Sequence, residues 1–275
     1  GSLTRELGLL NIENFIMIID QIKKTSFYIQ LYFQGEPFIN KNIFKMIKYA
    51  RKYKIYTSIS TNGLLLNSDK IDKIIENPPD KLIFSIDGMS EETYKKYRVG
   101  GKFSEAIESL TLLMEKKKIS NSKLPFIELQ FIAMKHNEHE IDDFLKFGNK
   151  IGADKSVIKS MQVSSYESAL EFLPKNSKYS RYIVRDGKLL FKNKLKNKCF
   201  SLWRTSVITW DGVVTPCCFD KDAKYSFGNV FPESFNSIWK NKKYNNFRKA
   251  ILTSRKEIDI CKNCTEGLNM NIIEK

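Results

Sequence analysis

The chain has 275 residues, of which 42% are hydrophobic and 12% aromatic, a composition that excludes disordered, collagen-like and disulfide-only proteins. No apolar run approaches the length of a membrane-spanning helix, so we expect no membrane partner. The net charge of +15 comes from lysines spread over nearly every expected helix, and this spread favours solvated helix faces over a nucleic-acid site.

Short β-rich runs alternate with stretches of helical period over the first 160 residues. Strands are predicted over residues 27–34, 56–61, 81–87, 125–134 and 154–159. Helices are predicted over 11–24 and 40–53, from Ser68 as N-cap to Pro78, and over 91–118 and 138–151. This alternation is typical of repeated β-α units around a parallel sheet, so the fold class is α/β. Because the series begins on a helix, we expect a barrel-like domain whose first strand is missing from this chain.

Three predicted strands end in a polar turn that contains glycine. In parallel α/β folds, ligands collect at the carboxyl ends of the strands. Glycine lets a ligand approach the backbone, and a neighbouring carboxylate can accept hydrogen bonds from an ammonium group or from ribose hydroxyls. One such turn alone fits an ordinary loop, but three on one rim predict a polar ligand. The three turns are Gln34-Gly35-Glu36-Pro37, Ser60-Thr61-Asn62-Gly63 and Ser85-Ile86-Asp87-Gly88.

Residues 161–198 lack strong periodicity and are interpreted as a connector to a cysteine-rich region. Cys261 and Cys264 form a CxxC pair, which can grip one metal or cluster from a single turn. Two β-rich runs flank Asp211-Gly212, which predicts a hairpin that carries Cys217 towards Cys199. In a reducing, cytoplasmic setting these four cysteines predict a metal centre rather than disulfides. The spare Cys218 is interpreted as a small buried hydrophobic residue.

These residues resemble the radical S-adenosylmethionine enzymes that carry a C-terminal twitch domain, the one-cluster relative of the SPASM domain. Gly35-Glu36-Pro37 resembles the family's GGE motif with Gln34 in place of the first glycine, and Lys135-x-Asn137-Glu138 resembles its fifth-strand exit. The resemblance implies that a set of strand-end residues contacts S-adenosylmethionine, with the methionyl amino group at the GGE segment and the ribose near Ser85 and Asp87. That set is Gln34, Gly35, Glu36, Pro37, Thr61, Asn62, Ser85, Asp87 and Asn137.

The spacing Gly212-x4-Cys217 matches the family's GX4C element. The resemblance implies that Cys199, Cys217, Cys261 and Cys264 ligate one auxiliary [4Fe–4S] cluster, in line with the preference of such clusters for four cysteines. It also implies a partial (β/α)6 barrel lacking its first strand over 1–160, the connector over 161–198, and a small α+β twitch or SPASM-like domain over 199–275.

The family's CxxxCxxC motif is not in this chain. Its three thiolates leave one iron free for S-adenosylmethionine, and it is expected just before Leu3, whereas all five cysteines here lie beyond residue 198. We therefore expect the full-length protein to bind S-adenosylmethionine and a second [4Fe–4S] cluster, and this chain by itself to be inactive.

The resemblance implies a radical oxidoreductase. In the family, a 5′-deoxyadenosyl radical abstracts a substrate hydrogen, and an auxiliary cluster can accept the electron that remains, which gives a dehydrogenase-type oxidation of a sugar or cyclitol alcohol such as 2-deoxy-scyllo-inosamine. Peptides are the second substrate class, and a flavodoxin or ferredoxin is the implied electron donor. An alcohol oxidation also needs a proton acceptor. The candidates are Lys159, Arg181, Arg185 and Arg204.

Two other interpretations of the chain stay open. CxxC with two further thiolates also suits a structural zinc site in a noncatalytic module. A degenerate barrel could bind S-adenosylmethionine or a partner peptide without turnover. His136 and His139 lack further ligands at suitable spacing and are interpreted as a solvated helix start rather than a metal site.

Overall fold

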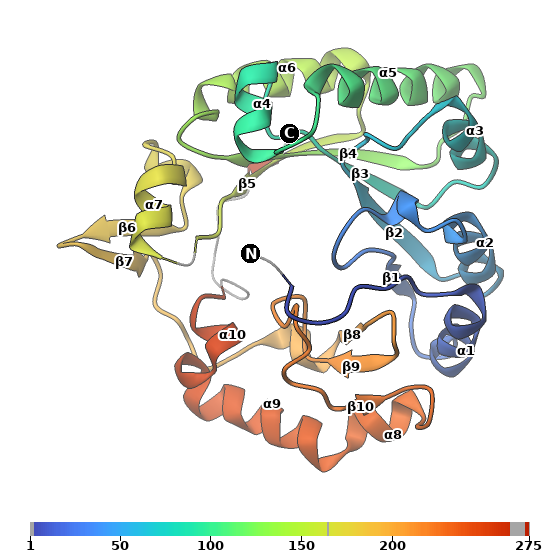
Figure 1. Cartoon of the computed structure of the whole chain (residues 1–275), viewed down its shortest axis with the longest axis vertical. Coiled ribbons are helices and arrows are strands. Elements are labelled where there is room, and N and C mark those ends of the chain that lie inside the picture. Colours follow the sequence, from blue (N-terminus) through green and yellow to red (C-terminus); the bar gives the residue numbers. More distant parts are fainter. Residues whose placement is uncertain (1–2, 164, 265–272, 275) are drawn as a thin grey trace. The chain divides into compact units, whose positions relative to one another are not determined.

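The computed structural model describes residues 3–163, 165–264 and 273–274. The chain forms two compact units, which interleave along the sequence. The first, called here the cysteine unit, comprises 1–35, 40–55 and 194–268, and the second, called the sheet unit, comprises 36–39, 56–193 and 269–275. The elements of both units are labelled in Figure 1.

Four parallel strands form the main sheet of the sheet unit, and a short antiparallel strand joins β5 at one edge. Ile83 lies opposite Glu128, and Gln130 lies opposite Val157, so these residues share one face. These four parallel strands agree with their predictions to within two residues at each end, whereas the strand predicted over 27–34 spans only Tyr28–Gln30 and the edge strand was not expected. In sheet order they are β2 (Tyr56–Thr61), β3 (Lys81–Ser85), β4 (Phe126–Ala133), β5 (Lys155–Ser160) and β11 (Ile273–Glu274).

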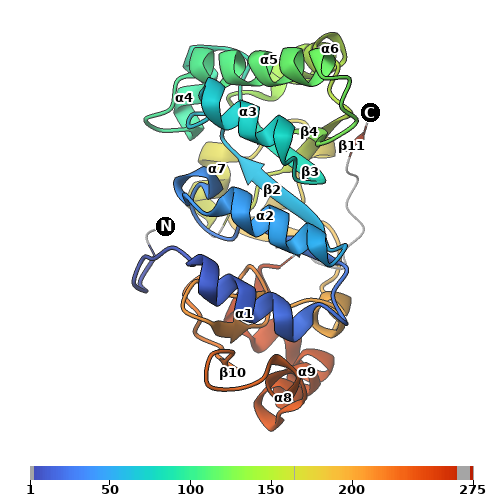
Figure 2. The same cartoon turned by 90° about the vertical axis from the view of Figure 1, so that its right-hand side faces the viewer.

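Helices cover one face of this sheet (Figures 1 and 2). Alternate strand residues such as Phe84 and Phe131 are fully buried towards them, and the rings of Phe131 and Phe144 lie 5.0 Å apart. Burial of such side chains supplies most of the stabilisation of a sheet of this kind. The helices are α3 (Ser68–Glu76), α4 (Glu91–Tyr97), α5 (Phe103–Ile119) and α6 (Ile141–Ile151), with the short turns η1 (Pro37–Ile39) and η2 (Glu138–Glu140).

Two details of the predicted helices are wrong. The N-cap of α3 is Asn67, whose side-chain oxygen accepts a hydrogen bond from the Lys70 amide at 3.0 Å, so Ser68 is the first helical residue. The predicted helix over 91–118 is two helices, because Gly100 adopts a φ of +80° between them. Both errors come from local backbone chemistry that hydrophobic periodicity does not report.

The expected connector contains a helix and a hairpin that belong to the sheet unit. Tyr182 and Phe191 stack with ring centroids 5.2 Å apart, and Val163 and Ala169 are buried beside them. The segment is therefore ordered, although its elements are too short to show a period. They are α7 (Tyr166–Phe172), η3 (Ser177–Tyr179), β6 (Tyr182–Arg185) and β7 (Lys188–Phe191).

The cysteine unit joins the start of the chain to its cysteine-rich end. Apolar residues of the first two helices, such as Phe15 and Met46, share one hydrophobic cluster with Phe227, Tyr244 and Cys261. The N-terminal elements are α1 (Ile12–Ile22), β1 (Tyr28–Gln30) and α2 (Ile43–Lys52). The later elements are η4 (Phe200–Trp203), β8 (Val207–Ile208), β9 (Val213–Thr215), β10 (Gly228–Asn229), α8 (Phe235–Lys240), α9 (Lys242–Ser254), η5 (Arg255–Glu257) and α10 (Asp259–Lys262).

Specific hydrogen bonds hold α1 to the later part of the cysteine unit. The Gln21 side chain donates to the Val230 carbonyl at 2.9 Å and accepts from the Phe235 amide at 2.7 Å. A side chain on Gly8 would overlap the Trp210 ring at 2.3 Å, so glycine is needed where these segments meet. The compact units thus cross the domain limits expected at residues 160 and 199, and those limits stay a prediction.

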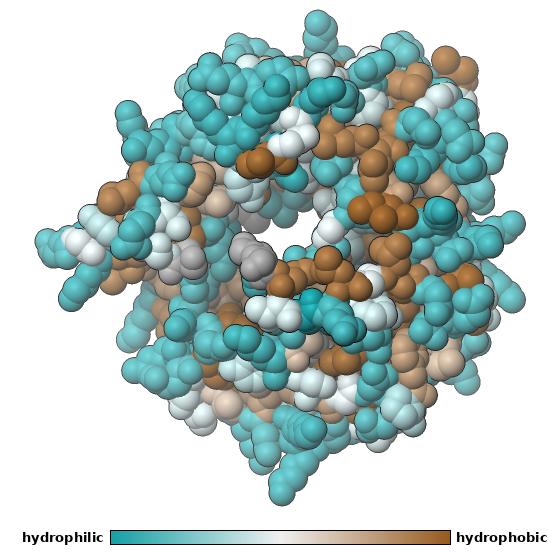
Figure 3. Space-filling model, viewed as in Figure 1, coloured by the Kyte–Doolittle hydropathy of each residue, from teal (hydrophilic) through white to brown (hydrophobic). Residues whose placement is uncertain are grey.

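Hydrophilic side chains are common on the surface of the outer helices. On the face drawn in Figure 3, hydrophilic side chains cover the outer helices. None of the helices in the described part of the chain combines the length and the apolarity that crossing a membrane requires.

Candidate metal centre and strand-end site

A tight hairpin delivers Cys217, as the Asp-Gly signal predicts. Strands β8 and β9 pair antiparallel, and the Gly212 amide donates to the Thr209 carbonyl at 2.9 Å across the turn. Gly212 has a φ of +83°, and a Cβ there would lie 2.7 Å from the Asn229 side chain. Only glycine fits this turn without strain, which explains the first position of the GX4C element. Strand β9 ends two residues before Cys217.

The loop after Cys217 is anchored by two carboxylates. Asp220 is 1% exposed and accepts from the Lys224 amide at 2.8 Å and the Tyr225 amide at 2.9 Å. Burial raises the pKa of Asp220, whereas these two N–H donors favour its carboxylate form. The Tyr225 hydroxyl donates to Asp259 at 2.6 Å. Asp259 begins α10, so this contact links the Cys217 loop to the helix that carries Cys261.

The CxxC pair is buried at the end of α10. Cys261 is 7% and Cys264 is 6% exposed, and the Cys264 amide donates to the Cys261 carbonyl at 3.1 Å. Cys199, half-buried, packs against the hydrophobic cluster that contains Cys261. Cys217 is also half-buried, and the five cysteines, all within the described residues, are not joined in disulfides. Cys218 is exposed, so its interpretation as a buried hydrophobic residue is wrong.

Electrostatic effects between the thiols indicate that Cys261 lies near Cys199, Cys217 and Cys264. Burial raises the pKa of Cys261 to about 12, with further increases from Cys264 and Cys199 and an opposing effect of Arg255. Burial likewise raises the pKa of Cys217 to about 12, the Phe219 amide opposes the rise, and Cys218, Cys264 and Cys261 add to it. Each thiol of the set thus lies close enough to another to influence its charge. Buried thiolates of this kind need a compensating cation, which a bound metal centre provides.

The donor set fits an iron-sulfur cluster. Four cysteines are the usual ligands of a [4Fe–4S] cluster, and here they lie in an apolar surrounding that limits solvent access. Within the described residues, no three cysteine, histidine or carboxylate side chains are grouped closely enough to hold one metal ion. Thiolates on four separate irons lie farther apart than thiolates on one ion, so a cluster does not require that grouping.

Glu36 connects two of the predicted strand ends in the sheet unit. Its Oε1 accepts from the Thr61 hydroxyl at 2.9 Å, and its Oε2 accepts from the Asn62 amide at 2.9 Å. Pro37 begins η1 directly after it. Gln34 and Gly35 belong to the cysteine unit and are exposed, and Gly35 has a φ of +77° with open space around it. The structure therefore brings Glu36, Thr61 and Asn62 together at the end of β2.

Asp87 and Asn137 fasten the ends of β3 and β4. Both are fully buried. Asp87 accepts from the Ile132 amide at 2.7 Å and from Arg98 Nε at 2.7 Å, and burial raises its pKa against the opposing charge of Arg98. Asn137 donates to the carbonyls of Asp87 and Ile132 and accepts from the Met134 amide at 2.7 Å. Their cofactor contact stays a prediction, and both side chains carry a structural role. Ser85, at the end of β3, is half-buried.

A polar group occupies the sheet face opposite the helices. Glu128, 5% exposed, accepts from Lys81 Nζ at 2.6 Å and from the side-chain Nε2 of Gln130 at 2.6 Å. Lys159 lies on the same face of β5, and the register places it opposite Ile132. Desolvation lowers the pKa of Lys159, Glu128 opposes this effect, and the positive charges of Lys81 and Arg181 add to it. The Lys159 side chain remains exposed to solvent, so neighbouring atoms remove it from water only in part.

The four candidate proton acceptors do not form one group. Arg181 lies near Lys159 and donates to the Ser160 carbonyl at 2.7 Å. Arg185 is exposed on the β6–β7 hairpin. Arg204 belongs to the cysteine unit, where its guanidinium lies 5.2 Å from the Phe200 ring centroid.

Sequence reasoning missed Asp220 and Arg255. Asp220 follows Cys217 by three residues, and an aspartate near an Asp-Gly hairpin belongs to no recognised sequence motif. Arg255 lies in a run of charged residues that reads as solvated surface, yet it is 1% exposed.

Comparison with known proteins identifies the family. Residues 3–148 match the Radical SAM superfamily, and residues 199–265 match the SPASM iron-sulfur cluster-binding domain. The chain belongs to the radical SAM superfamily. The radical SAM domain binds S-adenosylmethionine and a [4Fe–4S] cluster, and the SPASM domain binds auxiliary iron-sulfur clusters, as the resemblance implied.

Three similar proteins each align with most of this radical SAM chain. The tungsten-containing aldehyde ferredoxin oxidoreductase cofactor-modifying protein of Pyrococcus furiosus is 25% identical over 292 residues, covering 94% of this chain and 80% of that protein. The crystal structure of BtrN in complex with AdoMet and 2-DOIA has a TM-score of 0.54 at 19% identity, covering 96% of this chain and 83% of that chain. Streptococcus suis SuiB bound to precursor peptide SuiA has a TM-score of 0.63 at 14% identity, covering 94% and 63%. The structural matches confirm the α/β fold followed by a small domain.

Proposed function

We propose that the full-length protein is a radical S-adenosylmethionine dehydrogenase that oxidises an alcohol of a sugar or cyclitol and passes one electron to an auxiliary [4Fe–4S] cluster. The presence of Cys199, Cys217, Cys261 and Cys264 within the SPASM match, with the CxxC pair buried, supports this proposal. S-adenosylmethionine and the radical-domain cluster, when bound, supply the abstraction of a hydrogen atom from substrate carbon. The residues of this chain bind, orient and shield the reactants.

The balance of an alcohol oxidation defines what the protein must provide. Conversion of a carbinol to a carbonyl removes one hydrogen atom, one proton and one electron. The cysteine quartet holds the acceptor of the electron, and a basic side chain must take the proton. An arginine stays protonated in proteins, so Arg181, Arg185 and Arg204 are poor acceptors.

Lys159 is the side chain that best suits the proton acceptor. Desolvation lowers its pKa, which raises the share of neutral amine that can accept a proton. Glu128 lies on the same face, but its carboxylate already binds Lys81, so Glu128 is a poorer proton acceptor than Lys159. Glu36, Thr61 and Asn62 form the proposed cofactor edge at the end of β2. A flavodoxin or ferredoxin in the cytoplasm is the proposed electron donor.

A peptide-modifying maturase is the second candidate function. BtrN was crystallised with 2-DOIA, whereas SuiB was crystallised with a precursor peptide, and both share the fold of this chain. The related Pyrococcus protein is named for modifying a cofactor. The substrate class is therefore tested directly, by offering cyclitols and precursor peptides to the same enzyme preparation.

Metal analysis of this chain, purified without oxygen, tests the cluster. We expect iron and acid-labile sulfide in equal amounts, close to four of each per chain, with visible absorption that bleaches on reduction. One zinc per colourless chain would instead establish the noncatalytic zinc module. Zinc acquired after cluster loss is identified by repeating the analysis on protein reconstituted with iron and sulfide.

Activity is tested in the protein expressed from its complete gene. We expect Lys159→Met to abolish ketone formation while 5′-deoxyadenosine still forms, because hydrogen abstraction precedes proton transfer. Lys155→Met, at the other end of the same strand, is the matched control and should retain ketone formation. Full ketone formation by the Lys159 variant would refute the assigned proton acceptor.

A further inference from the structure

A buried arginine joins the two ends of the cysteine-rich region. Arg255 is 1% exposed and is among the largest fully buried side chains of the described chain. Its guanidinium donates to the Lys198 carbonyl and, at 3.2 Å, to the Cys264 carbonyl. Lys198 directly precedes Cys199, so one side chain contacts the backbone at the first and the last cysteine of the quartet.

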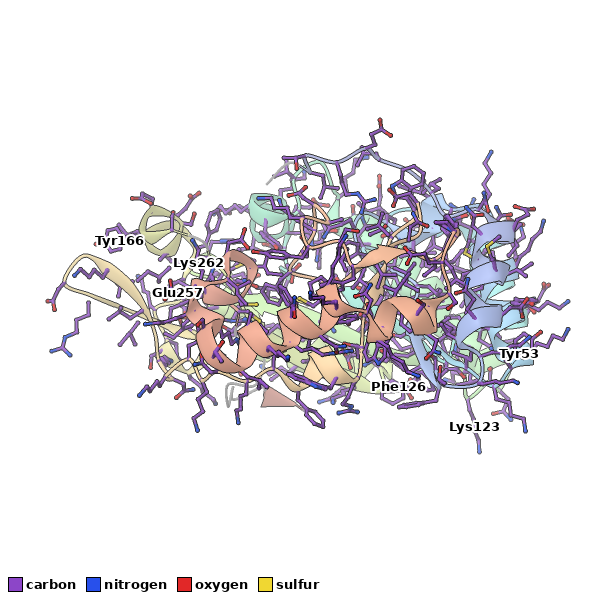
Figure 4. All side chains as sticks on the ribbon, turned by 90° about the horizontal axis from the view of Figure 1, so that it is seen from below. Tyr53, Lys123, Phe126, Tyr166, Glu257 and Lys262 are labelled. Carbon is purple, nitrogen blue, oxygen red and sulfur yellow. The ribbon has the colours of Figure 1, made fainter. Side chains whose placement is uncertain are left out.

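Backbone hydrogen bonds near Arg255 also join the segment before Cys199 to the end of α9. Its amide donates to the Asn197 side chain at 3.2 Å, and the Asn197 amide group donates in turn to the Thr253 carbonyl at 2.6 Å. The chain before Cys199 is therefore fixed to the segment that leads from α9 to α10. Glu257 and Lys262, labelled in Figure 4, lie at the last residues of η5 and α10, the segment that begins at Arg255.

The charge of Arg255 is buried beside the cysteine backbone. Its guanidinium is in contact with the carbonyls of Lys198 and Cys264, with almost no exposure to solvent. A neutral amide could satisfy the same two carbonyls, whereas only a cation offsets the negative charge of several thiolates in an apolar surrounding. The position of an arginine here thus suits a strongly anionic centre.

We propose that Arg255 is the positioning residue of the auxiliary cluster and sets its reduction potential. The proposal rests on the cluster of the proposed function. A cluster that gains an electron gains negative charge, and a cation buried beside it stabilises the reduced form more than the oxidised form. Arg255 therefore raises the potential and makes the centre a better acceptor for the electron of a substrate radical.

Potentiometric titration of the cluster, followed by electron paramagnetic resonance, tests the charge. All five cysteines of this chain lie at or after residue 199, so the signal of the 275-residue chain comes from the auxiliary centre. We expect Arg255→Gln to disfavour reduction about tenfold, a shift of about 59 mV to more negative potential for a one-electron couple. Arg255→Lys keeps the charge and should keep the potential near that of the wild type.

Arg248→Gln is the matched control. Arg248 lies on α9, its guanidinium lies 4.0 Å from the Tyr244 ring centroid, and it donates to the Trp239 carbonyl at 2.8 Å. Its replacement removes a partly buried guanidinium without touching the backbone of a cysteine. We expect an unchanged potential in this variant, and an equal shift in both glutamine variants would overturn the role of Arg255.

Iron release is a second measurement, and it tests the proposal even if Arg255→Gln fails to fold. Lysine cannot contact both carbonyls as the planar guanidinium does, so Arg255→Lys should release iron to a chelator several-fold faster than wild type. Release at the wild-type rate would overturn the positioning role. A wild-type cluster with an unshifted potential in Arg255→Gln refutes this inference alone, whereas zinc in the reconstituted wild type refutes the cluster and the inference together.

Discussion

In the sheet unit, strands β2 to β5 bury one continuous apolar face against α3, α5 and α6. In the cysteine unit the strands are two or three residues long, and two side chains buried there are the thiols of Cys261 and Cys264. A core of the first kind is stable through hydrophobic burial alone. A core that buries metal ligands depends on what those ligands bind. We therefore predict that the surroundings of the cysteines, unlike the sheet unit, depend on a bound metal centre for their order.

Loss of one buried cysteine gives the largest expected effect. Cys261→Ala should abolish cluster binding and unfold the surroundings of the quartet, because the remaining thiols cannot complete the centre. Trp203, Trp210 and Trp239 all lie in the cysteine unit, so tryptophan fluorescence reports on this unit alone. We expect the fluorescence of an unfolded chain, with protection from hydrogen exchange retained in β3 and β4.

Cys218→Ala is the control for that experiment. Cys218 is exposed and precedes the anchored turn at Asp220, so its removal should leave the iron content and fluorescence of the wild type. If β3 and β4 lose protection from hydrogen exchange in Cys261→Ala, the sheet unit also depends on the cluster. That result would contradict the proposed difference between the two units.

Truncation of a core residue in the sheet unit gives the next largest effect. Phe84 is fully buried, and Phe84→Ala should lower the free energy of unfolding by about 3–5 kcal/mol through lost burial and a residual cavity. Hydrogen exchange of β3 and β4 measures this loss. The iron content should stay at the wild-type level, and a parallel loss of iron would contradict the independence of the two cores.

The sequence predicted the sheet unit better than the cysteine unit, for a physical reason. Strands such as 56–61 are short, mostly buried runs, and they follow helices whose own apolar period is visible in the chain. In the cysteine unit the order comes from single side chains, including the buried Asp220 and Arg255, and from the packing of α1 against residues more than 200 positions away. Local pattern cannot report such contacts. The CxxC spacing and the Gly212 turn were visible because each is itself a local geometry.

The buried amide between β3 and β4 gives a smaller, local effect. Asn137→Ala leaves the carbonyls of Asp87 and Ile132 and the Met134 amide without this partner, and each unpaired buried group costs about 1–3 kcal/mol. We expect faster exchange at the ends of β3 and β4. Asn149→Ala on the exposed face of α6 is the control, and equal destabilisation by both would contradict the fastening role.

The smallest effect concerns pH and Lys159. Desolvation lowers the pKa of this lysine in the folded protein below its ordinary value of 10.5, so between the two values the unfolded chain binds more protons. The free energy of unfolding therefore rises with pH through that window, and below it the charged lysine destabilises the fold by a constant amount. Lys159→Met should raise stability at neutral pH and remove the alkaline rise, as measured by urea unfolding followed by far-ultraviolet circular dichroism. Lys150→Met on exposed α6 should keep the rise, and an alkaline rise that persists in Lys159→Met would assign it to another group.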